Sequence, residues 1–292
     1  MYANKIALGT VQFGLDYGVA NEAGQVKSGE VKQILSEAKK NGINMLDTAI
    51  AYGTSEEVLG KAGADDFRVV TKLPSLPSDE GNIACWVRDQ VAASLKRLGQ
   101  ETLYGLLLHC PQDLLGLNGS ALIQALASLK NDRVVQKIGI SIYCPDALEE
   151  ILKKTPIDLV QAPLNVVDRR LQSSGWLYRL KDDGVEVHTR SAFLQGLLLM
   201  ERSKITQKFS RWSNLWDQWY EKLKVQGVSP LAASLAYPLS FEQVDKVIVG
   251  VDSAPQLLEI LQAAKNANEG PDTSFMCSAD LDLINPYNWN HL

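Results

Sequence analysis

Cysteine and histidine are scarce in this chain of 292 residues, which has four of the former and three of the latter. The cysteines lie far apart, no Cys-x-x-Cys pair occurs, and no histidine stands at the spacing of a zinc finger. These absences exclude a disulfide framework and a structural zinc site. We therefore expect no metal, and four buried or half-buried free thiols: Cys85, Cys110, Cys144 and Cys277.

An excess of one charge and long apolar runs are also missing. The 29 Lys and Arg residues are scattered among 34 Asp and Glu residues, for a formal net charge of −5, so there is no basic footprint for nucleic acid or an anionic membrane surface. No apolar run approaches the roughly 18–20 residues of a membrane span, and the charge at Lys5 does not fit a secretory signal peptide. We expect a cytoplasmic protein that binds small molecules, and its oligomeric state stays open.

Glycine-rich phosphate loops are the third absence. A doubly wound open sheet would be expected to carry one in its first turn, yet neither G-x-G-x-x-G nor G-x-x-x-x-G-K-[ST] occurs. Short apolar runs instead alternate with helical patterns along the chain, among them one helix opening at Ser28 as its N-cap and one over about 171–181. The predicted strands are 6–8, 43–46, 68–71, 104–108, 135–140, 157–160, 185–188 and 244–249. Eight such repeats predict a (β/α)8 TIM barrel of the α/β class, as a single domain over 1–292.

Polar residues stand at the ends of the predicted strands. In barrels of this type the chemistry lies at the C-terminal ends of the strands, because the loops that follow them meet at one face. We therefore expect the active site there. The strand-end residues are Asp47, Lys72, His109, Ser141, Gln161, Ser191 and Gly250.

At these positions the chain resembles the aldo-keto reductase family. Matching segments occur in order from Gly9 to Glu259, which is most of the chain. They are Gly9-Thr10 with Phe13-Gly14, the block from Asp47 to Glu56, Thr71-Lys72, Leu108-His109, Gly139-Ile140-Ser141, Gln161 with Asn165, and Gly250 to Leu257. The resemblance implies reduction of an aldehyde or ketone by a nicotinamide cofactor, or oxidation of a sugar-like alcohol in the reverse direction.

The resemblance assigns proton transfer to Tyr52. Free tyrosine has a pKa of about 10 and gives up its proton poorly at neutral pH, but a neighbouring cation favours the phenolate, and Lys72 is the candidate. Asp47 would hold Lys72 charged and in place, and His109 would donate to the carbonyl oxygen. Each residue alone has an ordinary structural explanation, such as an ion pair at the barrel rim for Asp47 and Lys72. The four together favour catalysis.

The resemblance also implies a set of residues that bind NADP or NAD. Ser141 and Gln161 correspond to the groups that hold the nicotinamide carboxamide in the family, although Ile142 stands where an Asn is common. The segment from Gly250 into a helix is suited to the cofactor's phosphates, with Ser253 as an ordinary helix cap in the alternative. The candidates are Gly9, Thr10, Asp47, Ser141, Gln161, Arg190, Ser191, Phe193, Gly250, Asp252, Ser253, Gln256 and Glu259.

Two departures from the family pattern concern specificity. Arg190 stands where the family has an aromatic residue that stacks on the nicotinamide; its guanidinium would stack in its place, bind an anionic group of the substrate, or form an ion pair at the rim. Members that prefer NADP carry Lys or Arg after the eighth strand, whereas this chain has Asp252 and Gln256 there, while Glu259 is suited to the adenine amino group. The choice between NADP and NAD is therefore open.

Three further patterns leave alternatives. The barrel would also suit a regulatory protein that senses nicotinamide nucleotides with little turnover, or a non-redox epimerase that uses Tyr52 and Lys72. The aromatic residues Trp212, Trp216, Trp219 and Tyr220 have helical spacing, which predicts packing between helices, with a flap over the barrel mouth as the alternative. The C-terminal aromatics would border the pocket or anchor the terminus.

Overall fold

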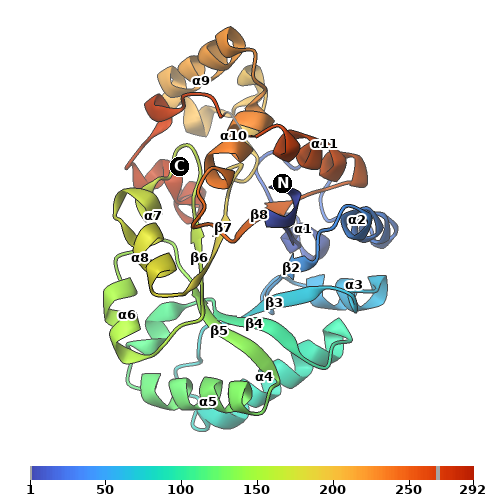
Figure 1. Ribbon diagram of the computed structural model, residues 1–292, viewed down its shortest axis with the longest axis vertical. Helices are drawn as coiled ribbons and strands as arrows, with labels where there is room; N and C mark the ends of the chain where they lie inside the picture. Colours follow the sequence, from blue (N-terminus) through green and yellow to red (C-terminus); the bar gives the residue numbers. More distant parts are fainter. Residues whose placement is uncertain (1, 268–269) are drawn as a thin grey trace.

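The computed structural model describes residues 2–267 and 270–292, and within them eight parallel strands close into a barrel in chain order (Figure 1). This confirms the predicted (β/α)8 barrel. The strands are β1 (Ile6–Gly9), β2 (Met45–Asp47), β3 (Arg68–Leu73), β4 (Leu103–Leu108), β5 (Val135–Ser141), β6 (Leu159–Pro163), β7 (Glu186–Arg190) and β8 (Lys246–Gly250).

Helices connect successive strands and lie outside the barrel (Figure 1). The main helices are α2 (Ser28–Lys40), α3 (Ser55–Ala62), α4 (Ile83–Leu98), α5 (Gly119–Asn131), α6 (Leu148–Lys154), α7 (Arg170–Ser173), α8 (Trp176–Asp182), α9 (Ser213–Gln226), α10 (Pro230–Leu239) and α11 (Ala254–Lys265). Short turns complete the chain: α1 (Val11–Gly14), α12 (Leu281–Ile284), and the 3-10 turns η1 (Tyr2–Lys5), η2 (Pro111–Leu114), η3 (Leu197–Leu199), η4 (Arg202–Lys204), η5 (Gln207–Trp212), η6 (Ser274–Met276) and η7 (Pro286–His291).

Several predicted element boundaries are wrong. The helix predicted over 171–181 is two helices, because Gly175 takes a left-handed conformation (φ 81°) between α7 and α8 and interrupts the helical backbone. The strand predicted over 43–46 begins only at Met45. Ser28 is the first helical residue and not the cap, since Lys27 occupies the cap position and no side chain caps this end.

The barrel interior is filled by apolar side chains from alternating strand positions. One buried cluster lies inside the barrel, as expected because the interior of such a barrel is a packed core and not a pore. Its members are Ala7, Met45, Val70, Leu107, Leu159 and Ile248. The larger cluster lies between the strands and the outer helices, so the strands are fixed on both faces and the residues at their ends are held rigidly.

A network of charged and polar groups surrounds Glu186, the first residue of β7. Its carboxylate accepts a hydrogen bond from the Tyr104 hydroxyl (2.8 Å), pairs with the Lys137 ammonium, and lies 2.7 Å from Nε2 of His188. Burial alone raises the pKa of Glu186, but the bonds to His188, Lys137 and Tyr104 outweigh it and lower its pKa to about 2. The carboxylate is therefore charged at any pH near neutrality.

A second apolar core lies between α9, α10 and the C-terminal segment. Trp216 and Trp219 are buried there, and their indole Nε1 groups donate to the carbonyl oxygens of Phe209 (3.1 Å) and Leu198 (3.2 Å). This confirms the predicted packing between helices, and the flap is wrong, since no tryptophan of the described residues lines the barrel cavity. Trp289 packs into the same core and anchors the terminus, whereas Tyr287 is exposed.

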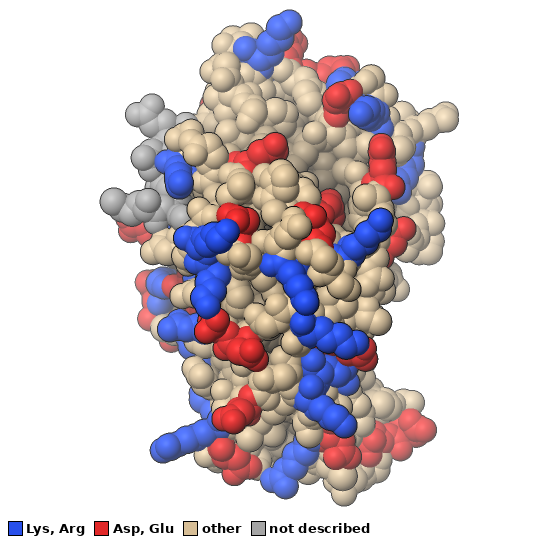
Figure 2. Space-filling view, turned by 90° about the vertical axis from the view of Figure 1, so that its right-hand side faces the viewer, with Lys and Arg blue, Asp and Glu red and all other residues tan. Residues whose placement is uncertain are grey.

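The molecular surface agrees with the even distribution of charge in the sequence. Figure 2 shows Lys and Arg interspersed with Asp and Glu on the face that it draws. Among the described helices none has both the length and the apolar character needed to cross a membrane. All four cysteines are free thiols, but Cys85 and Cys277 are exposed, which contradicts the expected burial.

Candidate active site

The structure brings the four predicted proton-transfer residues together at the C-terminal end of the barrel. Asp47 is the last residue of β2, Lys72 lies near the end of β3, and His109 directly follows β4. Tyr52 lies in the loop between β2 and α3. Because these strands are neighbours in the barrel, the three strand-borne side chains converge on Tyr52.

Lys72 and Asp47 form a buried ion pair. The Lys72 ammonium is fully buried and donates to Oδ2 of Asp47 at 2.7 Å and to the carbonyl oxygen of Thr48 at 2.8 Å. Burial alone lowers the pKa of Lys72, but the Asp47 carboxylate and the Tyr52 hydroxyl more than offset it, so that the pKa lies above its ordinary value of 10.5. The ammonium therefore stays charged throughout the neutral pH range.

Tyr52 lies between this ammonium and His109. Nζ of Lys72 is 4.9 Å from the centroid of the Tyr52 ring, and the His109 ring meets it edge to face with 5.9 Å between the centroids. The backbone of Tyr52 is fixed by hydrogen bonds from its N–H to the Ala49 carbonyl oxygen and from the Ser55 N–H to its own carbonyl oxygen, each of 3.0 Å. The phenol is thus held at a defined place in the site.

His109 is neutral in this environment. Burial is the main reason that its pKa is lowered from 6.5 to about 4, and the positive charges of Lys72 and Arg190 lower it further. A neutral imidazole carries one N–H and one acceptor nitrogen. His109 therefore has a single ring proton to donate to a group in the cavity.

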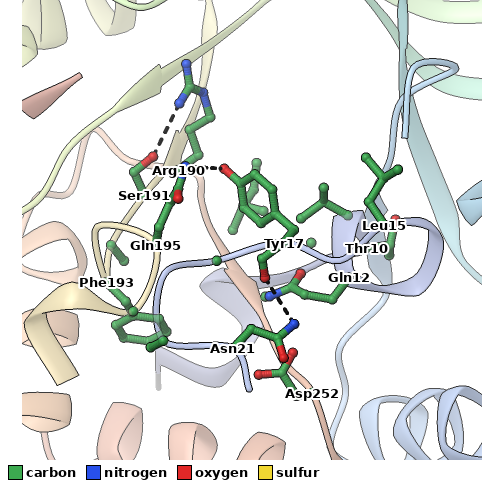
Figure 3. A pocket seen from close by; sticks show the side chains of 18 of the residues that line it. Thr10, Gln12, Leu15, Tyr17, Asn21, Arg190, Ser191, Phe193, Gln195 and Asp252 are labelled. Atoms are coloured by element: carbon green, nitrogen blue, oxygen red, sulfur yellow. Dashed lines mark hydrogen bonds between the residues drawn. The ribbon is translucent and has the colours of Figure 1, made fainter. Parts of the chain in front are cut away.

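A cavity of about 720 Å³ opens beside these residues and continues along the barrel rim (Figure 3). Its volume lies within the usual range of about 300–1,000 Å³ for ligand pockets. Ten of the predicted cofactor residues line it: Gly9, Thr10, Asp47, Ser141, Arg190, Ser191, Phe193, Gly250, Asp252 and Gln256. Tyr52 and His109 line it as well, whereas Lys72 lies behind Asp47 and Tyr52 and is closed off from the cavity.

Gln161 is placed differently from the other expected cofactor residues. It is fully buried, and its Nε2 donates to Oδ1 of Asp47 at 2.6 Å while its Oε1 accepts from the Ser141 hydroxyl at 3.2 Å. Both ends of its amide are thus engaged, and it does not line the cavity. In this arrangement Gln161 orients the carboxylate that holds Lys72, and Ser141 is the member of the pair that faces the cavity.

Arg190, the last residue of β7, forms no ion pair with any described carboxylate, so the expected ion pair at the rim is wrong. Its guanidinium donates to the carbonyl oxygen of Ile142 at 3.0 Å and to the Ser191 hydroxyl at 3.3 Å, and it stacks 4.7 Å from the centroid of the Tyr143 ring. The charge is therefore held in place by neutral groups at the edge of the cavity.

Two buried acceptors that lack donors lie near the end of β8, one on Asp252 and one on Gln12 of α1. Among the described residues, Oδ1 of Asp252 and Oε1 of Gln12 have no hydrogen-bond partner, and both side chains line the cavity (Figure 3). Ser253 caps α11 by accepting from the Gln256 N–H (3.3 Å) and does not line the cavity. Glu259 is exposed on α11, outside the cavity.

Comparison with known sequences decides the family. The profile of the aldo/keto reductase family matches residues 5–270. The chain belongs to the aldo/keto reductase family. The resemblance inferred from the motifs at the strand ends is thereby confirmed.

Several other proteins are similar to this chain over most of their length. An uncharacterised oxidoreductase, YqkF, of Bacillus subtilis is 28% identical over 79% of this chain and 81% of that protein. An NADH-specific methylglyoxal reductase of Escherichia coli is 27% identical over 80% and 81%, respectively. The structure of the aldo-keto reductase AKR11C1 from Bacillus halodurans, in its holo form, superposes with a TM-score of 0.72 at 22% identity, over 93% of this chain and 89% of that chain, which shows the shared fold.

Membership places the chain among oxidoreductases that use a nicotinamide cofactor. Several residues that line the cavity carried no clear signal in the sequence: Gln12, Tyr17, Asn21, Tyr143 and Gln195. Tyr143 lies two residues beyond the strand-end Ser141, a spacing that would have marked it as a neighbour of the site.

Proposed function

We propose that this protein reduces an aldehyde or ketone, or oxidises a sugar-like alcohol in the reverse direction, with Tyr52 as the proton donor or acceptor. The observation that carries the proposal is the buried Lys72–Asp47 pair next to Tyr52, with His109 beside it, at the edge of a cavity of cofactor size. Because four groups with these roles lie together, they favour a proton-transfer site over a purely structural ion pair.

The chemistry follows from the positions of the four groups. A bound reduced nicotinamide would supply the hydride for the carbonyl carbon and would become oxidised in doing so, and negative charge would then develop on the carbonyl oxygen. The N–H of neutral His109 orients and stabilises that oxygen, and the Tyr52 hydroxyl transfers its proton to it, leaving a phenolate. The ammonium of Lys72 stabilises the phenolate until a proton from solvent restores the phenol.

The residues at the β8 end of the cavity are suited to NADH. The start of α11 places the positive end of its helix dipole at this end of the cavity, although the N–H groups of Ala254 and Gln256 already donate to Glu30 (2.7 Å) and Ser253 (3.3 Å). The unpartnered acceptors on Asp252 and Gln12 require donors, which ribose hydroxyl groups supply. A 2′-phosphate would bring negative charge against the Asp252 carboxylate. We therefore propose that NADH binds more tightly than NADPH.

The role of Tyr52 is tested with Tyr52→Phe. We expect kcat to fall by roughly 10²–10⁴-fold, the usual range for loss of general acid catalysis, while the Kd for NADH changes little because the ring remains in place. Tyr178→Phe, at an exposed tyrosine on α8, is the matched control and retains full activity. Undiminished turnover of aldehydes by Tyr52→Phe would contradict the proposed role.

Cofactor choice is tested by separate fluorescence titrations with NADH and NADPH. We expect NADH to bind about tenfold more tightly, and Asp252→Asn to reduce this ratio because the repulsive charge is removed. Glu259→Gln, which changes a charge outside the cavity, should leave the ratio unaltered. Binding of NADH without oxidation by any aldehyde would favour nucleotide sensing, and failure to bind either cofactor would favour a non-redox barrel enzyme.

A further inference from the structure

Arg190 is an unusual cation among the residues that line the cavity. Lys204, which also lines it, lies 3.8 Å from a carboxylate oxygen of Glu201. Arg190 has no such partner among the residues that the structure describes; its guanidinium contacts only neutral acceptors on Ile142 and Ser191. A half-buried cation without a counterion attracts an anion from solution more strongly than a paired one does.

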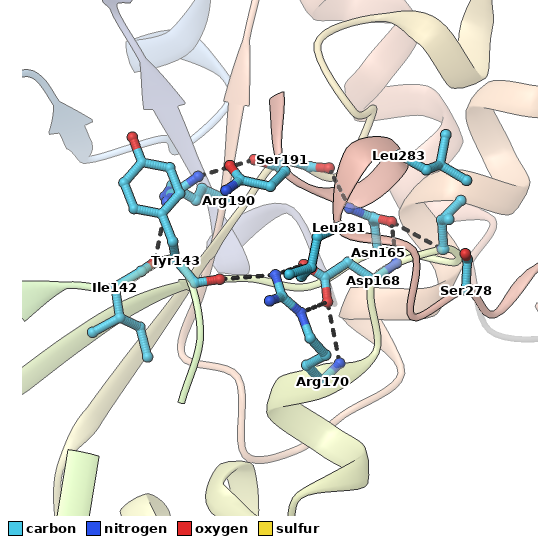
Figure 4. A network of polar contacts seen from close by, with 12 residues as sticks. Ile142, Tyr143, Asn165, Asp168, Arg170, Arg190, Ser191, Ser278, Leu281 and Leu283 are labelled. Atoms are coloured by element: carbon cyan, nitrogen blue, oxygen red, sulfur yellow. Dashed lines mark hydrogen bonds and ion pairs between the residues drawn. The ribbon is translucent and has the colours of Figure 1, made fainter. Parts of the chain in front are cut away.

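The guanidinium is held in a fixed orientation by its surroundings (Figure 4). It stacks on Tyr143, whose carbonyl oxygen accepts a hydrogen bond from Arg170 at 2.9 Å. Arg170 is in turn bound to the fully buried carboxylate of Asp168 (2.8 Å). The ion pair between Arg170 and Asp168 thus limits the movement of Tyr143 and of the guanidinium stacked on it.

The backbone on the other side of the guanidinium is fixed as well. The amide nitrogen of buried Asn165 donates to the carbonyl oxygen of Ser191 at 3.0 Å, and its amide oxygen accepts from the N–H groups of Val167 and Asp168 (Figure 4). Ser191 itself has φ 62°, an uncommon conformation for a residue with a side chain. A polar network therefore maintains this conformation next to the cation, as is common at binding sites.

The guanidinium keeps free donors for a ligand. Arg carries five N–H groups in a planar fork, and two of them are used by Ile142 and Ser191, which leaves three. A planar fork of this kind binds carboxylate or phosphate through two parallel hydrogen bonds. Its position relative to the proton-transfer groups is equally telling, because Arg190, Tyr52 and His109 line the same cavity and its charge acts on His109.

We propose that Arg190 binds a carboxylate or phosphate group of the substrate, so that the preferred substrates are carbonyl compounds bearing an anionic group. This inference rests on the proposed function, since it takes the carbonyl to be reduced at Tyr52. With the anion on Arg190, the reactive carbonyl of a small substrate would lie in the cavity that Tyr52 and His109 also line.

The test compares matched pairs of carbonyl compounds that differ in one anionic group. Glyceraldehyde 3-phosphate is compared with glyceraldehyde, and succinic semialdehyde with butanal, so that the two pairs distinguish phosphate from carboxylate. The quantity measured is the ratio of kcat/KM for the anionic member to that for the neutral member. We expect Arg190→Gln to lower this ratio roughly 10- to 100-fold for at least one pair, the range for loss of hydrogen bonds between charged groups. Arg190→Lys should restore only part of it, because an ammonium lacks the fork.

Lys204→Gln is the matched control, since it removes a second cation from the lining of the same cavity. An equal fall of the ratio in Lys204→Gln would show that overall charge and not Arg190 selects the substrate, and would overturn the proposal. An unchanged ratio in Arg190→Gln would overturn it too. So would a loss of NADH affinity as large as the loss of the ratio, because Arg190 would then serve the cofactor.

Calorimetric titration measures anion binding without turnover, so it tests the anion site independently of the proposed reaction. Glycerol 3-phosphate, 4-hydroxybutyrate and glycerol are titrated into the wild-type protein and Arg190→Gln, each saturated with NADH or free of it. We expect at least one of the two anions to bind the wild type in at least one of these states and to bind Arg190→Gln at least tenfold more weakly. If no carbonyl compound is reduced, this result still supports an anion site at Arg190, whereas equal affinity of the two proteins for both anions, or no binding of either anion to the wild type, overturns it.

Discussion

The buried ion pair between Lys72 and Asp47 allows a quantitative prediction for Asp47→Asn. Two donors converge on the carboxylate, the Lys72 ammonium at 2.7 Å and Nε2 of Gln161 at 2.6 Å. Asparagine has the same shape but only one side-chain oxygen, so one of these donors must face an amide nitrogen. The ammonium is then buried without a counterion, which costs about 3–5 kcal/mol when one partner of a buried pair is removed.

The free energy of unfolding should fall by that amount. At about 2–3 °C per kcal/mol for a chain of this length, the midpoint of thermal unfolding should fall by roughly 6–15 °C. Urea unfolding followed by circular dichroism and by tryptophan fluorescence measures the loss directly, and agreement of the two probes checks two-state behaviour. A loss below about 1 kcal/mol would mean that the pair is hydrated and that the reasoning is wrong.

A double variant provides the control. Asp47→Asn combined with Lys72→Met removes both charges, and replacement of a whole buried pair is often neutral or stabilising. We therefore expect the double variant to be more stable than Asp47→Asn alone, so that the double-mutant cycle gives a large coupling energy. Losses that simply add across the two single variants would refute the interaction.

The pH dependence of Asp47→Asn has a definite sign. In the wild-type protein the pKa of Lys72 is raised, so its contribution to stability is complete below about 10.4 and is lost as the pH rises through the folded-state value. Without the carboxylate, burial lowers the pKa of Lys72 below that of the unfolded chain. The variant should therefore gain stability as the pH rises toward about 10, and its difference from the wild type should narrow.

Three more predictions concern single residues. Glu186 has a pKa of about 2 in the folded protein, so it stabilises the fold above its ordinary pKa of 4.5, and this stabilisation is lost as the pH falls toward 2. Glu186→Gln should lower the free energy of unfolding by about 2–3 kcal/mol at pH 7, measured by urea unfolding, and the stability of the variant should depend less on pH between 4.5 and 2. His109, whose pKa is about 4 when folded and about 6.5 when unfolded, makes the protein less stable as the pH falls from 6.5 to 4; His109→Gln should remove this dependence, and an unchanged slope would count against its burial as a neutral group. Gly14→Ala would place a methyl group into the Tyr52 carbonyl oxygen, and we expect kcat and thermal stability to fall together. Gly29→Ala, at a glycine of α2 with open space around it, should leave kcat unaltered.

The fold was predictable because its signal repeats along the chain. Polar residues stand at or next to the ends of most strands, and the barrel topology brings these ends to one face, so Asp47, Lys72 and His109 are placed together before any coordinates are known. Helix boundaries were less accurate, since one glycine such as Gly175 interrupts a helix whose apolar spacing continues on both sides. Periodicity registers the spacing of side chains and not the backbone angle of one residue.

Contacts made by side chains within the site were not predictable. Gln161 follows the expected pattern for a residue that faces a cofactor, yet its amide is engaged by Asp47 and Ser141. Arg190 has no carboxylate partner among the residues that the structure describes, although acidic residues are common in the chain. Its stacking on Tyr143 depends on the relative position of the loops after β5 and β7, about which the order of residues says nothing.

The groups that we propose for proton transfer and those that we propose for substrate selection are attached to different strands of the barrel. Asp47, Lys72 and His109 come from β2 to β4, whereas Tyr143 and Arg190 follow or end β5 and β7. Substitution of Arg190 would break no hydrogen bond of the first set, and it would remove only a secondary cause of the lowered His109 pKa, which is due mainly to burial. Gene duplication followed by change at two or three loop positions would then convert such an enzyme to a new metabolite in few steps, while the reaction itself is inherited unchanged.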